Sequence, residues 1–138
     1  MTEIIQFKNV ISHFEKLILG ELKNEKITCW VAGGAVRDYF MGVVIHTDYD
    51  LFFPNKLNYD KAYSYLNDVG GEIKWESANG CKIVYKNRTF DLVKKFFDDP
   101  QSTIEAFDYT VSMFAVDTKS LFWGNSIYRS SKKTTNDK

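Results

Sequence analysis

Three strand-like segments between residues 72 and 96 lie so close together that they limit the fold of this chain more than any other feature. The segments are EIKWES (72–77), CKIVYK (81–86) and TFDLVKKF (89–96). The dipeptides NG at 79–80 and NR at 87–88 separate them, and both are turn signals. We therefore expect a three-stranded meander, and with it a fold that contains a sheet.

Helical and strand-like patterns alternate along the rest of the chain. Apolar residues at helical spacing predict helices at 3–23, 35–41 and 58–71, and a short helix at 102–107. Asn58 and Ser102 are the expected N-caps of the last two helices. Apolar, β-rich runs predict strands at 27–32, 48–53 and 120–128, whereas 109–117 fits either a helix or a strand.

No repeat and no linker separates these elements, so we expect one α+β domain. Its expected architecture is a mixed or antiparallel sheet with helices packed on it. The domain occupies residues 1–128, and residues 129–138 form a basic, flexible C-terminal tail.

The composition limits the class of protein. The chain has 138 residues and a formal net charge of zero, so any contact with nucleic acid must come from local patches. Cys29 and Cys81 lie far apart in apolar contexts, which predicts free, buried thiols in a reducing compartment. The N-terminal segment lacks the pattern of a signal peptide, and no apolar run is long enough to span a membrane. We therefore expect a soluble, cytoplasmic protein with no membrane partner.

Two alternating carboxylates stand near the end of the segment WVAGGAVRDYFMGVVIHTDYDLFF, residues 30–53. The side-chain period of two in a strand places Asp48 and Asp50 on one face. There they repel each other unless a cation lies between them, and oxygen ligands of this kind suit Mg²⁺. A solvated loop is the ordinary alternative for such a pair.

Two glycines in the same segment predict a phosphate site. Gly33 and Gly34 precede the N-terminus of a helix, where free backbone N–H groups and the helix dipole favour an anion. Arg37, one turn later, adds a positive charge. A plain turn is the ordinary alternative for two glycines after a strand.

The order of these features resembles the signature of the nucleotidyltransferase superfamily. GGAVRD (33–38) and DYD (48–50) match an apolar strand, G-G-x-V-R-D, a spacer and D-x-D. The resemblance is to the head domain of CCA-adding tRNA nucleotidyltransferases and bacterial poly(A) polymerases, and it implies a single polymerase-beta-like nucleotidyltransferase domain. In that family the two aspartates bind the catalytic metals, while the Gly-Gly turn and the arginine hold the triphosphate. The resemblance implies these roles for Asp48, Asp50, Gly33, Gly34 and Arg37.

Two later segments extend the resemblance. The family has a third acidic position on a neighbouring strand, and TFDLVKK supplies Asp91 there, although solubility of an edge strand also explains this residue. AFDYTVSM (106–113) aligns with a later motif that helps to recognise the ribose, which implies nucleotide-binding roles for Asp108 and Thr110. Ala106 and Phe107 stand where that motif has two arginines, so this part of the match lacks two positive charges.

The implied activity is a metal-dependent transfer by an enzyme. Asp48, Asp50 and Asp91 would be the catalytic and metal-binding residues for two Mg²⁺ ions, or Mn²⁺ in their place. The implied reaction moves a nucleotide from a nucleoside triphosphate to a hydroxyl group, with an RNA (tRNA-like) 3′ end as acceptor. The family's base-selecting domains have no counterpart here, so the chain would either act with relaxed base choice or need a partner protein that supplies substrate selection. Two alternatives stay open: a nucleotidyltransferase that modifies a protein or a small molecule, as in toxin–antitoxin systems, and a catalytically degenerate domain that binds nucleotide or a partner.

Overall fold

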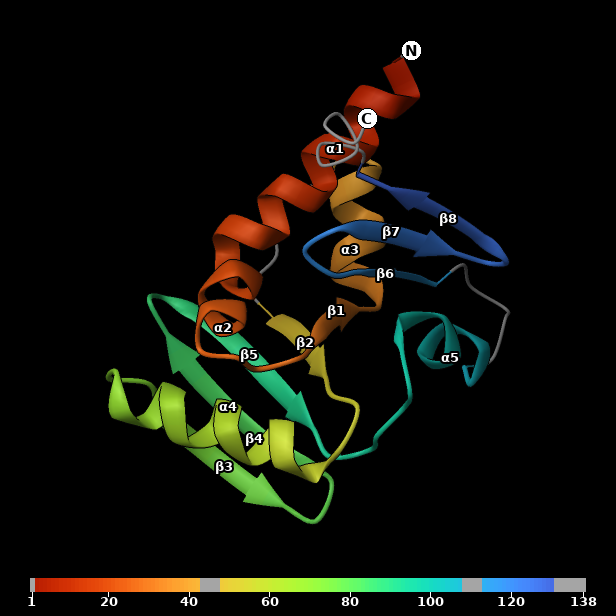
Figure 1. The fold of residues 1–138 in the computed structure, drawn as a ribbon. Coiled ribbons are helices and arrows are strands. Elements are labelled where there is room, and N and C mark those ends of the chain that lie inside the picture. The colour runs from red at the N-terminus through yellow and green to blue at the C-terminus, as the bar shows by residue number, and fades with distance from the viewer. Residues whose placement is uncertain (1, 43–47, 108–112, 131–138) are drawn as a thin grey trace.

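An eight-stranded sheet organises the residues that the computed structural model describes, which are 2–42, 48–107 and 113–130 (Figure 1). The strands are β1 (Trp30–Ala32), β2 (Asp48–Phe52), β3 (Glu72–Ser77), β4 (Gly80–Tyr85), β5 (Arg88–Val93), β6 (Phe114–Val116), β7 (Ser120–Trp123) and β8 (Ser126–Arg129). Their order across the sheet is β3-β4-β5-β2-β1-β6-β7-β8. β2 and β5 run parallel, and the other neighbouring pairs in this part of the chain are antiparallel. The predicted α+β fold is confirmed, and its sheet is mixed and mostly antiparallel.

Four helical segments accompany the sheet in the part of the chain that the structure describes. A long N-terminal helix is made of α1 (Thr2–Phe14), the π-helical turn η1 (Glu15–Leu19) and α2 (Gly20–Asn24), and α3 (Gly34–Phe40), α4 (Lys56–Asp68) and α5 (Pro100–Glu105) follow. Each lies where the sequence predicts a helix, with ends that differ by a few residues. None of the helices in the described residues is long and apolar enough to cross a membrane.

The N-terminal helix widens in its middle, which the apolar spacing does not indicate. At the end of η1 the N–H of Gly20 donates to the carbonyl oxygen of Glu15, five residues earlier. A Cβ atom on Gly20 would lie 3.0 Å from that oxygen. Because glycine has no side chain, the backbone closes the wider turn without this contact.

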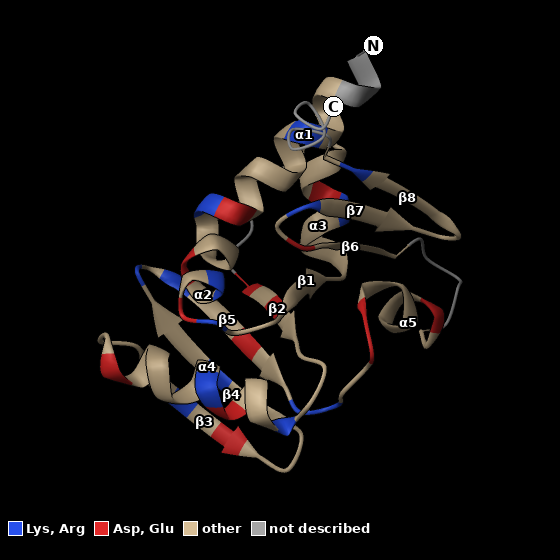
Figure 2. Ribbon diagram, viewed as in Figure 1, with Lys and Arg blue, Asp and Glu red and all other residues tan. Residues whose placement is uncertain are grey.

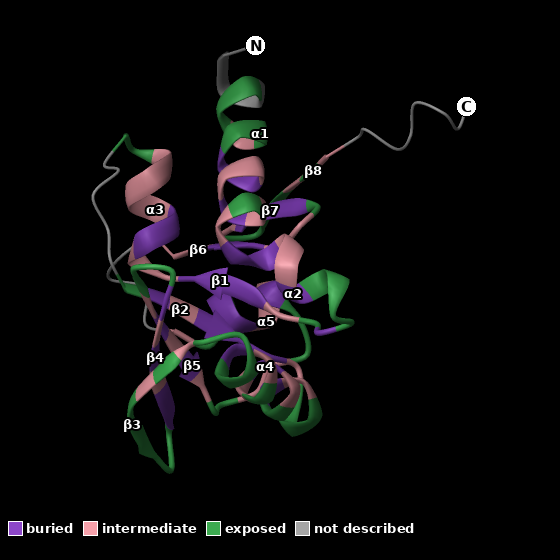
Figure 3. Ribbon diagram, turned by 90° about the vertical axis from the view of Figure 1, so that its left-hand side faces the viewer, coloured by how far each residue is buried: buried purple, intermediate pink, exposed green. Residues whose placement is uncertain are grey.

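The central strands separate two apolar clusters, one on each face of the sheet. Val31 and Leu51 belong to a large core formed with the N-terminal helix, α3 and α4. Trp30 and Phe52 alternate with them and pack with Ile104 of α5 in a smaller cluster on the opposite face. α5 contacts β1, β6 and β7, and none of the described helices lies over that face of β3, β4 and β5 (Figure 3). We call this side of β3, β4 and β5, which none of the described helices covers, together with the adjoining part of β2, the open face.

Both predicted N-caps are wrong by three residues. α4 is capped by Asn55, whose side chain accepts from the N–H of Asn58 at 3.0 Å. α5 is capped by Asp99, whose side chain accepts from the N–H of Ser102 at 2.8 Å. Asn58 and Ser102 are therefore the third residues of their helices, the position whose N–H a capping side chain binds.

Two strand predictions also need correction, whereas the meander at β3, β4 and β5 is confirmed. The strand predicted at 27–32 is limited to β1. The segment 120–128 forms two strands, β7 and β8, because the chain reverses at Gly124, whose φ of +56° favours glycine. Of the ambiguous segment 109–117, residues 114–116 form β6, and residues 108–112 lie outside the described part. β8 reaches Arg129, and the division at residue 128 between domain and tail stays a prediction.

One carboxylate connects three elements at the end of the long helix. Glu21 of α2 accepts hydrogen bonds from the hydroxyl groups of Tyr65 in α4 and Tyr85 in β4, each at 2.6 Å. Lys86 Nζ lies 3.8 Å from its other oxygen. Burial acts to raise the pKa of Glu21, but the two hydrogen bonds and Lys86 outweigh it and lower the pKa. The carboxylate therefore stays ionised and holds α4 and β4 against α2.

Replacing this carboxylate should weaken the fold. We expect Glu21→Ala to lower the free energy of unfolding by about 2 kcal/mol, because two partly buried hydroxyl groups lose their acceptor. Urea unfolding followed by circular dichroism measures the change. Glu25→Ala, at an exposed position nearby, is the matched control and should change it by less than about 0.5 kcal/mol. Equal effects of the two substitutions would contradict the role of Glu21.

Candidate functional site

Parallel pairing of β2 with β5 brings three predicted site carboxylates together on the open face. Asp48 and Asp50 point to one side of β2, and Tyr49 between them is buried on the other. In the register of the pair, Asp50 lies opposite Asp91 and Asp48 lies opposite Thr89. Figure 2 shows acidic segments on both strands. Because β5 lies between β4 and β2, Asp91 does not belong to an edge strand, and the solubility of an edge does not explain it.

The carboxyl group of Asp50 is held in an unfavourable environment for a charge. Its burial, followed by the charge of Asp91, a hydrogen bond with Asp91 and the more distant charge of Asp48, raises the pKa of Asp50 to about 6. Lys82 acts in the opposite direction but does not cancel these effects. Since two carboxylates in contact share a site poorly when both are charged, this pair favours either a proton or a cation between its members.

Among the described residues, Lys82 of β4 carries the positive charge that contacts Asp91, and none of the sequence motifs indicated it. Its Nζ lies 2.9 Å from Asp91 Oδ1, with both side chains about one quarter exposed. Asp91 Oδ1 is itself buried and accepts no hydrogen bond of good geometry among the described residues, so the contact is an ion pair. Alternation in CKIVYK could have indicated an outward lysine, because Cys81 and Ile83 on either side of it are buried. Its proximity to Asp91 depends on the strand register, which the sequence does not show.

The carboxylates fit a cation by their chemistry, although they are not arranged around one. Within the described ranges, no group of three Asp, Glu, His or Cys side chains could hold a metal ion as it stands. The ammonium group of Lys82 already occupies a position against Asp91 that a cation would take. A metal ion bound by Asp48, Asp50 and Asp91 would therefore require these side chains to turn and Lys82 to move away.

The glycine turn lies beside the carboxylates. Gly33 has a φ of +107°, which favours glycine, and a Cβ atom there would lie 3.6 Å from Asp50 Oδ2. The N–H of Gly33 donates to the carbonyl oxygen of Phe114 in β6 at 3.0 Å, so it is already engaged. Gly34 begins α3, a helix of only seven residues. The turn is thus in place next to Asp50, and its predicted role in holding phosphate stays a prediction.

The basic residues of the two motifs have other partners. Arg37 forms an ion pair with its neighbour Asp38 at 3.1 Å, and its Nη2 lies 3.4 Å from the position of a Cβ atom on Gly34. Arg37 thus lies against the glycine turn, near enough for the predicted site. Lys94 and Lys95, which follow Asp91 in the sequence, lie over the rings of Tyr59 and Phe97 instead.

The ribose motif is only partly visible. Asp108 and Thr110 lie outside the described residues, so their predicted roles stay predictions. Phe107, which stands in place of an arginine, packs its ring against Phe52 and Phe97 in the smaller apolar cluster. Its side chain therefore contributes to apolar packing and not to nucleotide binding.

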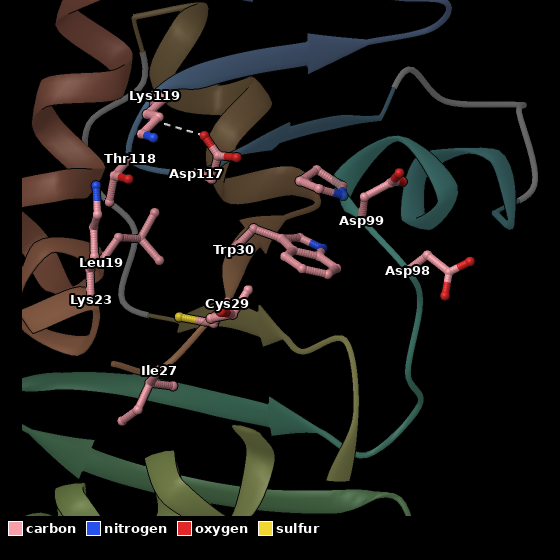
Figure 4. Close-up of a pocket in the computed structure, with 12 residues that line it drawn as sticks. Leu19, Lys23, Ile27, Cys29, Trp30, Asp98, Asp99, Asp117, Thr118 and Lys119 are labelled. Carbon is pink, nitrogen blue, oxygen red and sulfur yellow. Dashed lines mark hydrogen bonds between the residues drawn. The ribbon is translucent and has the colours of Figure 1, made fainter. Parts of the chain in front are cut away.

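A separate cavity of about 320 Å³ lies at the opposite end of β1 (Figure 4). Its polar groups hold loops in place. Asp99 caps α5, and Asp117 accepts hydrogen bonds from the N–H groups of Lys119 and Ser120 at 2.8 and 2.7 Å. Burial and the charge of Asp117 raise the pKa of the Cys29 thiol to about 12, so this free thiol is neutral at pH 7. None of the predicted site residues lines the cavity.

Comparison with known proteins does not support the family that the motifs suggested. A family model described as "Gabija anti-defense 2 family protein" matches residues 5–133. No curated protein and no solved structure matches the chain. The resemblance to CCA-adding enzymes and bacterial poly(A) polymerases is therefore wrong as an identification. The predicted function, nucleotide transfer to an RNA 3′ end with a role in tRNA processing, is wrong on the same finding, and neither of its two alternatives named an action against a defence system.

The short length of the matching motifs explains the error. GGAVRD (33–38) and DYD (48–50) are the only strong matches to the nucleotidyltransferase signature, whereas the family model extends over almost the whole chain. Phe107 departs from the signature, which has an arginine at this position. Its packing against the smaller apolar cluster explains the departure.

The pH dependence of stability should report the environment of Asp50. A raised pKa in the folded state means that protonated Asp50 stabilises the fold below about pH 4, and that this contribution is lost as the pH rises through about 6. Asp50→Asn cannot lose a proton. We therefore expect it to match the wild type near pH 4 and to exceed it by about 1–2 kcal/mol at pH 7.5, after allowance for solvent screening.

Urea unfolding in metal-free buffer at pH 4, 5.5 and 7.5 measures this difference. Asp60→Asn, at an exposed position on α4, is the matched control and should follow the wild type at every pH. A constant difference between Asp50→Asn and the wild type across the range would contradict the raised pKa.

Proposed function

Since the chain belongs to the Gabija anti-defense 2 family, we propose that it counteracts the Gabija defence system through the carboxylates on its open face. The proposed partner protein is a component of that system. The observation that supports this surface is the contact between Asp50 and Asp91 on a side of the sheet that no described helix covers.

Stability alone does not account for this contact. Two carboxylates that face each other cost free energy, and an apolar pair at the same register would pack without that cost. Perturbed carboxyl groups of this kind gather at functional sites. The neighbouring glycine turn leaves room beside Asp50, because a side chain at Gly33 would approach its carboxylate.

We propose that Asp48, Asp50 and Asp91 bind a divalent cation, Mg²⁺ or Mn²⁺, together with a ligand that carries phosphate. Carboxylate oxygens are the ligands that these ions prefer, and Mg²⁺ commonly combines one or two carboxylates with phosphate oxygens. A bound ion would neutralise phosphate charge and polarise a phosphorus centre. Lys82, released from Asp91, would then face the phosphates, and Arg37 lies near the glycine turn on the other side of Asp50.

A nucleoside triphosphate is the proposed ligand of this site. That the chain is an enzyme and that an RNA 3′ end is a partner both stay predictions. The finer fold expectation, a polymerase-beta-like domain, also stays a prediction, since no solved structure matches the chain.

Infection of bacteria that carry the Gabija system tests the proposal. We expect co-expression of the wild-type chain to restore plaque formation by a phage that Gabija restricts. Asp50→Asn should abolish this effect, because the substitution removes one charge from the cation site while leaving the fold at least as stable at neutral pH. Plaque counts on strains with equal amounts of soluble protein measure the outcome.

Asp60→Asn removes the same charge from an exposed position on α4 and should keep full activity. Full activity of Asp50→Asn would show that the chain acts on Gabija through another surface, and the proposed site would be abandoned.

A further inference from the structure

Trp75 on the edge strand β3 is the exposed aromatic residue of the open face. Its side chain is 49% exposed, whereas Trp30 is buried and Trp123 packs with Phe7 and Phe114. Among the large apolar side chains that the described residues expose, Trp75 is the one that lies on β3, β4 or β5. An exposed aromatic ring of this size can stack against a flat ligand such as a base.

A β-bulge turns Trp75 away from the core. Ile73 pairs with Ile83 and packs against the large core, and without an irregularity a residue two positions later would face the same way. The register shifts between Ile73 and Trp75, so that Trp75 pairs with Lys82. Glu76, the next residue, accepts a hydrogen bond from Tyr63 of α4 on the core side. Trp75 therefore points to the open face, and the bulge is the device that directs it there.

The same register places Trp75 in line with the charged site. The row runs from Trp75 to Lys82, from Lys82 to Asp91 and from Asp91 to Asp50, with one residue on each of β3, β4, β5 and β2. Neighbouring strands lie about 4.8 Å apart, so the tryptophan is roughly 10 Å from Asp91. An aromatic plane, an ammonium group and a carboxylate pair thus follow one another over the length of a nucleotide.

We propose that Trp75 is the stacking surface for the base of a nucleoside phosphate whose phosphates lie at Lys82 and at the cation held by Asp50 and Asp91. This inference rests on the proposed function and adds the residue that recognises the base. Stacking on an aromatic side chain suits any base, because every base has a π-face. A protein partner fits less well, since the core of such an interface needs contiguous apolar side chains, whereas Trp75 is flanked by the Glu72–Lys74 ion pair and by Lys82.

Binding of ATP and of inorganic tripolyphosphate, each with Mg²⁺, tests the inference by calorimetry. Tripolyphosphate carries the phosphates without a base. We expect the wild type to bind ATP more tightly than tripolyphosphate. Trp75→Leu should weaken ATP binding by roughly ten- to a hundredfold and leave tripolyphosphate binding unchanged. Trp75→Phe, which keeps a flat ring, should retain most of the preference, and Leu57→Ala, at an exposed position on α4, should retain all of it.

The outcomes separate this inference from the proposed function. If Trp75→Leu binds ATP as the wild type does, Trp75 does not stack the base, even where Asp50→Asn removes binding of both ligands and so supports the cation site. If the wild type binds tripolyphosphate and ATP equally well, the base is not recognised and the inference also fails. If it binds neither ligand, the open face is not a phosphate site, and the proposed site fails together with the inference.

Discussion

The parallel pairing of β2 with β5 is the constraint on which the rest of the structure depends. It joins the meander to the remainder of the sheet, and its register sets which side chains share a face. Leu51 and Leu92 are buried on one side of the pair, while Asp50 and Asp91 meet on the other. A slip by one residue would bury the carboxylates and expose the leucines, so the core that stabilises the fold also fixes the geometry of the site.

The free energy gained in that core offsets an unfavourable arrangement on the open face. Burial and the proximity of Asp91 raise the pKa of Asp50, and the ammonium group of Lys82 compensates only part of the negative charge. A divalent cation would relieve the repulsion and free Lys82 for an anion. The bulge directs Trp75 to the same face. The aromatic ring at the sheet edge and the carboxylates at the sheet centre therefore lie in one row.

Local patterns in the sequence predicted the elements well, but the features that decide the site depend on long-range contacts. The alternation of Asp48, Tyr49 and Asp50 correctly placed both carboxylates on one face, because that property belongs to a single strand. The pairing of Asp91 with Asp50, the ion pair with Lys82 and the reorientation of Trp75 depend on register and on a bulge, which no local pattern shows. The N-caps were misplaced because Asn55 and Asn58 are both good capping residues three positions apart, and only the helix start distinguishes them. The family was misidentified because the inference rested on two short motifs, whereas the family model matches residues 5–133.

A crystal structure of the protein grown with Mn²⁺, with anomalous scattering data recorded at the manganese edge, is the most direct test of the central proposal. We expect an anomalous peak between the carboxylates of Asp50 and Asp91, with Lys82 displaced from Asp91. The absence of a peak there, with the ion pair between Lys82 and Asp91 intact at millimolar Mn²⁺, would contradict a cation site on the open face.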